Sequence, residues 1–211
     1  MRRWIRAEWM SIGCLAALLL GCASTPPSSF YTLTPLSPDA VDGKVSGPEL
    51  SVGLGPVSFP VFLDRPQIVE REGGHRLTID EFHRWGGTLQ DDFLRVWSEN
   101  LALLLGTSRI LVFPSDIRYP LDFRVAAEVL AFEGTRGGDA VLKVRWFVLA
   151  PDVDRVLLVR EDVYRRPWDS SSDPGASIAA LSGALADFSR DVAAALRTLP
   201  RPVEPVQDQA R

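Results

Sequence analysis

Few side chains of this chain could carry out chemistry, and their spacing matches no catalytic or metal-binding motif. His75 and His83 are its two histidines, and their separation differs from that of zinc motifs such as H-E-x-x-H. A hydrolase would need one of them as a base and a serine distant in sequence, such as Ser98 or Ser115, as the nucleophile. Acidic pairs are adjacent in sequence, so their side chains diverge on a strand or a helix. We therefore expect no enzyme, no metal and no cofactor, with the hydrolase as an alternative.

Composition and charge indicate one globular domain. The chain has 211 residues, of which 46% are hydrophobic and 24% are charged, which is typical of an ordinary fold. Its net charge is -4, whereas proteins that bind nucleic acid present a basic surface to the phosphates. Nucleic acid is therefore not an expected partner.

The N-terminal residues have the pattern of a secretory signal. Three arginines precede the apolar run Met10–Leu20, which is shorter than the roughly 20 residues of a membrane-spanning helix. Leu19–Cys22 resembles the bacterial lipobox, in which the cysteine thiol takes a diacylglyceryl group, the signal is cleaved before it, and the new amino terminus is acylated. We predict a signal peptide over residues 1–21 and lipidation at Cys22. Cys14, the other cysteine, lies in the predicted signal, so no disulfide is expected.

A short polar segment follows the predicted lipidation site. Residues 22–29 are rich in serine and proline, and they predict a tether that joins the anchor to the domain. Ala23, and not aspartate, follows the cysteine. In enteric bacteria, an aspartate at this position retains a lipoprotein at the inner membrane. By resemblance to that sorting rule, Ala23 predicts that the protein lies on the periplasmic face of the outer membrane. Two or three acyl chains hold such a protein stably on a bilayer.

Several strands are expected in the first half of the domain. Phe30–Leu33 predicts a short strand. Glu49–Val57 predicts a strand that its glycines and proline place at an edge or at a bulge. Gln67–Glu70 and Arg76–Ile79 flank two glycines and predict a hairpin. Arg109–Phe113 is continuously apolar at its centre, which predicts a strand that is covered on both faces.

Two amphipathic helices should pack on these strands. Thr88, with Asp91 three residues later, resembles a capping box, and apolar residues recur from Leu89 until Gly106 ends the helix. The second helix, over 178–199, carries apolar residues at steps of three and four. Its many alanines favour the helix and permit close approach to a sheet.

Three extended segments between the helices predict an antiparallel meander. They are Phe123–Glu133, Ala140–Leu149 and Arg155–Tyr164. The middle segment alternates apolar and charged residues, so one face should belong to the core and the other should be half polar. We predict a single α+β domain over residues 30–200, with two main helices packed on a mostly antiparallel sheet, and a disordered tail over 201–211.

Four tryptophans could stack on a ligand or fill the core. Trp97 and Trp146 lie on predicted core faces, so we expect both in the core. Trp85 and Trp168 are flanked by arginines, and for these two residues the sequence leaves the core and an interface equally open.

Several stretches together resemble the PqiC family of membrane-integrity lipoproteins. The stretches that carry the resemblance are Val57–Val69, Arg84–Trp85, Glu99–Gly106, Phe30–Leu33 after the lipobox, and the long alanine-rich final helix. They cover nearly the whole chain after the predicted signal.

This resemblance implies an auxiliary component of an intermembrane lipid transport system that maintains envelope integrity. Such a protein would dock a periplasmic MCE-domain protein at the outer membrane, without enzymatic activity. The resemblance also implies a homo-oligomer, with the half-polar sheet face or the Val61–Pro66 loop as subunit contact. We expect Arg65 and Trp85 to contact the partner. The alternative is an independent lipid-binding or envelope-assembly lipoprotein without an MCE partner.

Overall fold

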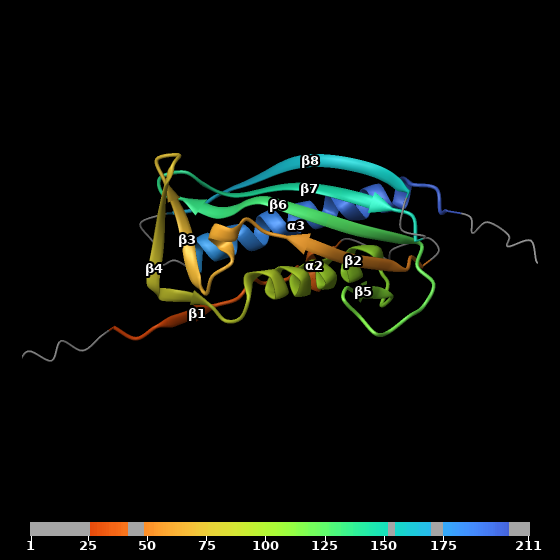
Figure 1. Ribbon diagram of the computed structural model, residues 1–211, viewed down its shortest axis with the longest axis horizontal. Helices are drawn as coiled ribbons and strands as arrows, with labels where there is room; N and C mark the ends of the chain where they lie inside the picture. The colour runs from red at the N-terminus through yellow and green to blue at the C-terminus, as the bar shows by residue number, and fades with distance from the viewer. Residues whose placement is uncertain (1–25, 42–48, 152–154, 170–174, 203–211) are drawn as a thin grey trace, which may run out of the picture.

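The computed structural model describes residues 26–41, 49–151, 155–169 and 175–202. The predicted signal peptide, Cys22 and most of the predicted C-terminal tail lie outside the described residues. The helices and strands are β1 (Ser29–Tyr31), β2 (Val52–Ser58), β3 (Gln67–Glu72), β4 (Arg76–Trp85), α2 (Leu89–Leu105), β5 (Ile110–Val112), β6 (Phe123–Thr135), β7 (Asp139–Leu149), β8 (Val156–Pro167) and α3 (Gly175–Thr198), with two 3-10 helices, η1 (Pro38–Ala40) and η2 (Val61–Leu63) (Figure 1).

The strands form one eight-stranded sheet with both helices on the same side. The order β1-β4-β3-β6-β2-β5 runs through most of the sheet, and β7 and β8 continue from the other side of β6. The long strand β6 is therefore the spine: its first half pairs with β2, its end pairs with β3, and β7 follows its other edge. Helix α3 packs on β6, β7 and β8, and α2 packs on α3, β2 and β5. This is the predicted α+β domain with two packed helices.

The sheet is mixed, with antiparallel pairing in its long ladders. β6 with β7, β7 with β8, and β3 with β4 pair antiparallel, as the meander and the hairpin predicted. The shorter ladders of β1 with β4, β2 with β5, β2 with β6 and β3 with β6 are parallel. Parallel partner strands are joined by long crossover connections. Local sequence patterns such as a hairpin turn therefore cannot predict which of these strands pair.

The sequence left two alternatives open for β2, a strand at the sheet edge or a strand with a bulge, and the structure decides between them. Strand β2 lies between β5 and β6, so it is an interior strand and the edge assignment was wrong. The alternative bulge is confirmed: the register with β6 shifts between Leu54 and Val57, where Gly55 has a φ of 113°. A side chain at Gly53 would also collide with the Phe113 ring, since a Cβ there would lie 2.7 Å from it.

The predicted helix and hairpin signals are confirmed, whereas β5 is less covered than expected. Thr88 accepts a hydrogen bond from the Asp91 backbone N–H at 3.1 Å, and Gly106 ends α2 with a φ of 66°. The glycine turn joins β3 to β4 as expected. Strand β5 lies at the sheet edge, and of its three residues only Leu111 is buried. Leu111 is buried on one face, and Ile110 and Val112 pack, partly buried, against the core on the other, so the predicted cover on both faces is present but incomplete.

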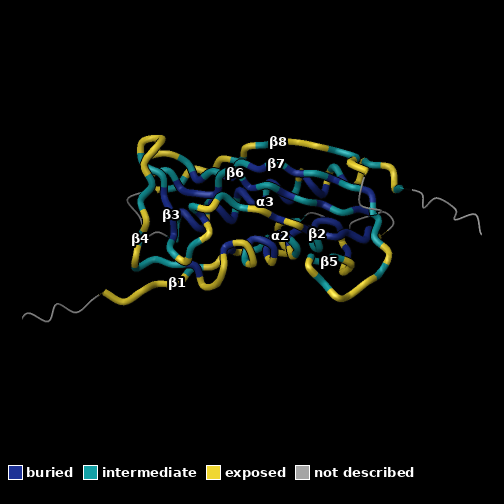
Figure 2. Tube along the Cα trace, viewed as in Figure 1, coloured by how far each residue is buried: buried dark blue, intermediate teal, exposed yellow. Residues whose placement is uncertain are grey.

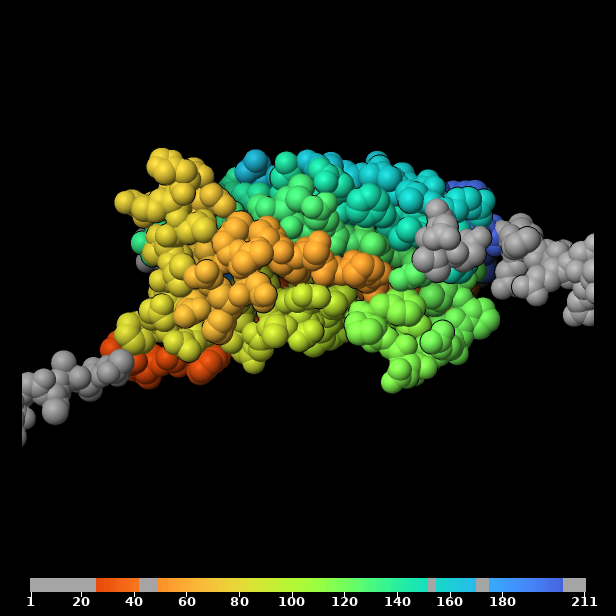
Figure 3. Space-filling model, viewed as in Figure 1, coloured from red at the N-terminus to blue at the C-terminus, as the bar shows by residue number. Residues whose placement is uncertain are grey.

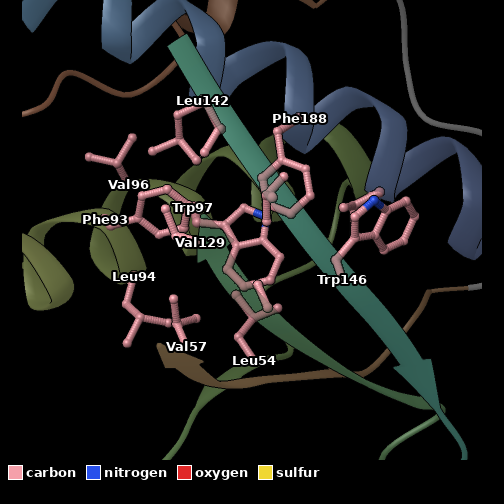
Figure 4. Close-up of a cluster of buried hydrophobic side chains, with 14 of the residues drawn as sticks. Leu54, Val57, Phe93, Leu94, Val96, Trp97, Val129, Leu142, Trp146 and Phe188 are labelled. Atoms are coloured by element: carbon pink, nitrogen blue, oxygen red, sulfur yellow. The ribbon is translucent and has the colours of Figure 1, made fainter. Parts of the chain in front are cut away.

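Buried aromatic rings fill the space between the helices and the sheet. Phe188 of α3 stacks on Trp97 of α2, with ring centres 5.1 Å apart, and meets Trp146 of β7 edge-on at 6.0 Å (Figure 4). All three side chains are fully buried, which confirms the core assignment of both tryptophans. The inward residues of β7 are fully buried as well, so the alternation predicted for this strand is confirmed (Figure 2).

Polar contacts fix α3 to the outermost strand of the meander. Tyr164 of β8 donates a hydrogen bond to Asp191 at 2.9 Å, and Arg166 contacts Asp187 through two N–H groups at 2.7 and 2.6 Å. Burial and the hydrogen bond to Asp191 both raise the pKa of the Tyr164 hydroxyl, which therefore stays protonated as a donor. These bonds set the position of α3 along β8.

Candidate functional site

The residues of the hydrolase alternative do not meet in the described structure. The Nδ1 of His83 lies 2.8 Å from Asp80 Oδ2 on β4, and His75 is exposed in the β3–β4 turn. The Ser98 hydroxyl donates to the Arg95 carbonyl on α2. Ser115 follows β5, at the other end of the sheet from β4 (Figure 1). Within residues 26–41, 49–151, 155–169 and 175–202, no hydrogen bond joins a serine to a histidine, and no His, Cys, Asp and Glu cluster could hold a metal.

The His83–Asp80 pair lies where the register of β4 with β3 shifts, between Asp80 and Arg84. Burial raises the pKa of the Asp80 carboxyl, but hydrogen bonds from the Phe82 backbone N–H and from His83 outweigh this effect, so the net pKa lies below its ordinary value. The Tyr31 ring of β1 lies 5.8 Å from the imidazole. The contacts of this pair are therefore structural, because they link β4 to β1.

The segment after β1 is bound to both helices. We call residues 32–36 the N-terminal strap. The side chain of Asp92 on α2 accepts a hydrogen bond from the Leu33 backbone N–H at 2.6 Å. Asn100, also on α2, accepts a hydrogen bond from the Leu36 backbone N–H at 2.7 Å. On α3, the Ser182 hydroxyl accepts a hydrogen bond from the Thr34 backbone N–H at 3.1 Å. Three backbone donors far from both helices in sequence are thus satisfied by side chains, so the strap lies across the helical layer.

Sequence reasoning missed the polar residues that hold the strap. Asn100, Ser182 and Ser189 are buried on otherwise apolar helix faces, and Asn100 also donates to Ser189 at 3.3 Å. Buried polar residues need hydrogen-bond partners. Their polarity at predicted core positions was therefore the available signal, but the sequence alone did not indicate what they bind.

Replacing Asn100 with alanine should loosen the strap while the rest of the domain stays folded. The change removes the acceptor of the Leu36 N–H, and an unsatisfied buried group costs about 1–3 kcal/mol. We expect a lower melting temperature and faster proteolysis within residues 32–41. The control is Ser98→Ala on the same helix, which removes only a bond to the helix's own backbone. Equal proteolysis of both variants would contradict this role of Asn100.

The loop around η2 forms an exposed corner next to the ends of β1 and β4. We call residues 59–66 the η2 corner. Val61 is 86% exposed beside a small cavity of about 80 Å³ that reaches the start of α2. The Pro66 carbonyl accepts from the Trp85 N–H at 2.8 Å, and Trp85 pairs with Tyr31 of β1. Arg65 is partly exposed here, and its Nε is buried without a hydrogen-bond partner among the described residues.

Burial decides between core and interface for Trp85 but not for Trp168. Trp85 is 5% exposed and belongs to the core cluster. Trp168 is partly buried and packs against the same cluster near Gly134. The structure therefore brings Arg65 and Trp85 to the same corner, but it leaves Trp85 too little surface to act as a contact. Of this pair, only Arg65 remains a candidate contact residue.

The face of the meander opposite the helices is half polar, as predicted. Arg145 contacts Glu128 at 3.0 Å and Glu161 at 2.7 Å, and Lys143 contacts Glu161 at 3.0 Å. Hydrogen bonds from Lys143 and Arg145 lower the pKa of the Glu161 carboxyl. The exposed Val163 of β8 lies opposite Lys143, and the exposed Val159 lies two residues before Glu161 on the same strand. Its charges are already paired, so this face is less suited than the η2 corner to attract a charged partner.

The fold and these surfaces define a two-layer α+β domain with candidate contact surfaces and no assembled catalytic centre in its described residues. The chain belongs to the family of ABC-type transport auxiliary lipoprotein components, whose model matches residues 31–193. The resemblance drawn from the sequence is confirmed. No helix of the described residues is long and apolar enough to cross a membrane.

Solved structures support the fold. An uncharacterised protein has a TM-score of 0.66 and 15% identity, with 81% of this chain and 99% of that chain covered. Protein XCC0632 from Xanthomonas campestris, of family DUF330, has a TM-score of 0.65 and 19% identity, with 79% and 93% covered. No curated protein matches the chain.

Proposed function

We propose that this protein is a lipid-anchored docking component on the periplasmic face of the outer membrane, where it holds an MCE-domain protein of a lipid transport system. Family membership supports the transport role. The lipobox-like Leu19–Cys22 supports the anchor. In this role the protein maintains envelope integrity by fixing a transporter to the membrane, and it carries out no chemistry itself.

The observation that carries the docking role is the attachment of the N-terminal strap to both helices. Six residues lie between Cys22 and Ser29 at the start of β1, so this end of the domain lies within about 25 Å of the anchor. Beyond β1, hydrogen bonds hold the strap on α2 and α3. A partner held by the domain is thus connected to the membrane through a short tether and a fixed segment, which raises its local concentration there.

Crosslinking in the native host tests this proposal. We expect the tagged full-length protein to recover an MCE-domain protein from the envelope fraction, and this fraction should co-purify with outer-membrane markers. Recovery of the protein with phospholipid alone would instead favour the alternative, an independent lipid-binding or envelope-assembly lipoprotein. Recovery of crosslinked copies of the chain would test the homo-oligomer in the same experiment.

Arg65→Glu should weaken partner capture without unfolding the domain. The side chain is partly exposed at the η2 corner and forms no ion pair within the described part of the chain, so a reversed charge acts mainly on a partner. We expect about tenfold less crosslinked partner, equivalent to roughly 1.4 kcal/mol. The control is Arg165→Glu on β8, an exposed position on another surface. Equal loss in both variants would contradict a specific contact at Arg65.

A further inference from the structure

The loop after β5 borders an open cavity that the docking role does not use. Residues 113–122, which we call the β5 loop, project from the end of the sheet opposite β4 (Figures 1 and 3). The cavity has a volume of about 380 Å³, within the size range of small-molecule sites. Its apolar lining consists of Leu111, Phe113, Pro114, Ile117, Tyr119 and Leu121. Ile117 is 65% exposed, so the cavity opens to solvent through an apolar rim.

The β5 loop is held in shape by bonds that do not involve a ligand. The Ser115 hydroxyl accepts from the Ile117 backbone N–H at 3.1 Å and fixes the turn. Phe113 and Leu121 close over Gly53 of β2, where a Cβ would lie 2.7 and 2.9 Å from their side chains. The absent side chain at Gly53 lets both residues reach across the sheet. The cavity is therefore a preformed feature of this end of the fold.

One arginine lines this cavity and two more lie over rings that line it, and none of the three has a carboxylate partner among the described residues. Arg118 lines it, the Arg124 guanidinium lies 4.8 Å from the Phe113 ring centre, and that of Arg109 lies 5.6 Å from the Tyr119 ring centre. None of the three is in an ion pair with another described residue, and the Arg124 Nε is buried without a hydrogen-bond partner in this part of the chain. This local excess of positive charge contrasts with the net charge of -4 of the whole chain.

The acidic residues of the β5 loop leave this charge largely uncompensated. Asp122 accepts from the Ser51 backbone N–H at 2.8 Å and lies 3.5 Å from Arg201, so its charge is engaged away from the arginines. Asp116 is exposed, and it is the one remaining carboxylate of residues 113–122, all of which the structure describes. Charge complementarity at the cavity therefore favours an anion.

We infer that the β5-loop cavity binds one acyl chain of an anionic amphiphile, with its phosphate or carboxylate headgroup held by Arg118 and Arg124. Apolar walls would take a hydrocarbon chain, whose burial a free inorganic ion cannot supply. Guanidinium groups bind phosphate and carboxylate through paired N–H donors. The ligand class is therefore a fatty acid or a phospholipid whose one chain enters the cavity.

This inference rests on the proposed role in lipid transport for the choice of a lipid as the ligand. It adds a binding site for lipid to a component proposed so far only to hold a partner. Its test uses purified protein without a partner. A failure to bind would therefore overturn the lipid site and leave the docking proposal to its own crosslinking test.

Calorimetry on the mature chain tests the site. The protein runs from residue 22 to 211 with Cys22→Ala, so it keeps every described residue, and the probe is dodecyl phosphate below its micelle concentration. We expect one bound molecule per chain. Dodecyl maltoside, which has the same tail and a neutral head, should bind at least about tenfold more weakly, and inorganic phosphate should not bind.

Charge reversal at the rim distinguishes this cavity from the rest of the surface. Arg118→Glu should weaken dodecyl phosphate binding at least about tenfold, whereas Arg165→Glu on β8 should leave it within about twofold. Both residues are exposed, so equal melting temperatures are expected. No binding, equal binding by the Arg118→Glu variant, or phosphate bound as tightly as dodecyl phosphate would each overturn the proposal. Loss of partner capture in Arg118→Glu without any amphiphile binding would assign the cavity to a protein contact instead.

Discussion

Replacing Cys22 with alanine is expected to release the protein from the membrane fraction almost completely. The lipobox-like motif ends at this residue, and each buried methylene of an acyl chain contributes about 0.8 kcal/mol to membrane binding. We expect two or three chains to account for the whole attachment, and the described residues include no membrane-spanning helix. The measurement is the share of the protein that sediments with membranes, compared with its share in the soluble periplasmic extract.

The experiment must distinguish loss of the lipid from retention of an uncleaved signal peptide. Because Cys22 also defines the predicted cleavage position, residues 1–21 are exchanged for a signal peptide that is removed independently of a lipobox, so that the Cys22→Ala chain begins at position 22. A matched chain with the same exchanged signal keeps Cys22, which then carries only a free thiol. We expect both forms to be released and to melt at the same temperature. Sedimentation of either form in high salt would show that another part of the chain holds the membrane.

Phe188→Ala is expected to cause the largest loss of stability of any change considered. Phe188 is fully buried where α3, α2 and the sheet meet, against Trp97, Trp146 and Tyr164, with ring centres 5.1 to 6.0 Å away (Figure 4). Removing a buried phenylalanine ring costs about 3–5 kcal/mol, because the cavity only partly collapses. This is a large share of the roughly 5–15 kcal/mol that stabilises a domain of this kind.

Denaturant unfolding of a chain of residues 22–211 measures this loss. We expect a lower unfolding midpoint for Phe188→Ala, followed through the tryptophan fluorescence, since two of its neighbours are indoles. The control is Phe30→Ala on β1, because that ring is 67% exposed and its loss should change stability by less than about 0.5 kcal/mol. A loss below about 1 kcal/mol for Phe188→Ala would show that the three rings around it repack without it.

The proposed functions occupy opposite ends of the molecule. Strand β1 and the η2 corner lie at one end, and the β5 loop lies at the other (Figure 1). A partner docked at the η2 corner would thus sit near the anchor, whereas a lipid at the β5 loop would be held far from it along the sheet. The Arg65→Glu and Arg118→Glu variants change these two ends separately, so their effects on partner capture and on amphiphile binding should be independent.

Local patterns were sufficient to predict most individual elements. The cap at Thr88, the glycine turn of the β3–β4 hairpin and the alternating residues of β7 each depend on neighbours within a few positions, and the structure confirms all three. The family resemblance rested on short stretches spread along the chain, and the family model confirms it. Such features can be recognised in a sequence because they follow from backbone preferences and from the period of a helix or strand.

Contacts between distant segments were decided only by the tertiary structure. The interior position of β2, the parallel pairs, the burial of Trp85 and the strap held by Asn100 all join residues far apart in the chain. The cavity of the β5 loop likewise depends on how that loop folds back across Gly53. By itself the sequence determined the element types, the predicted anchor and the family. Which strands became neighbours and which polar groups met was settled by the packing of the whole chain, because those contacts lower the free energy only when distant segments come together.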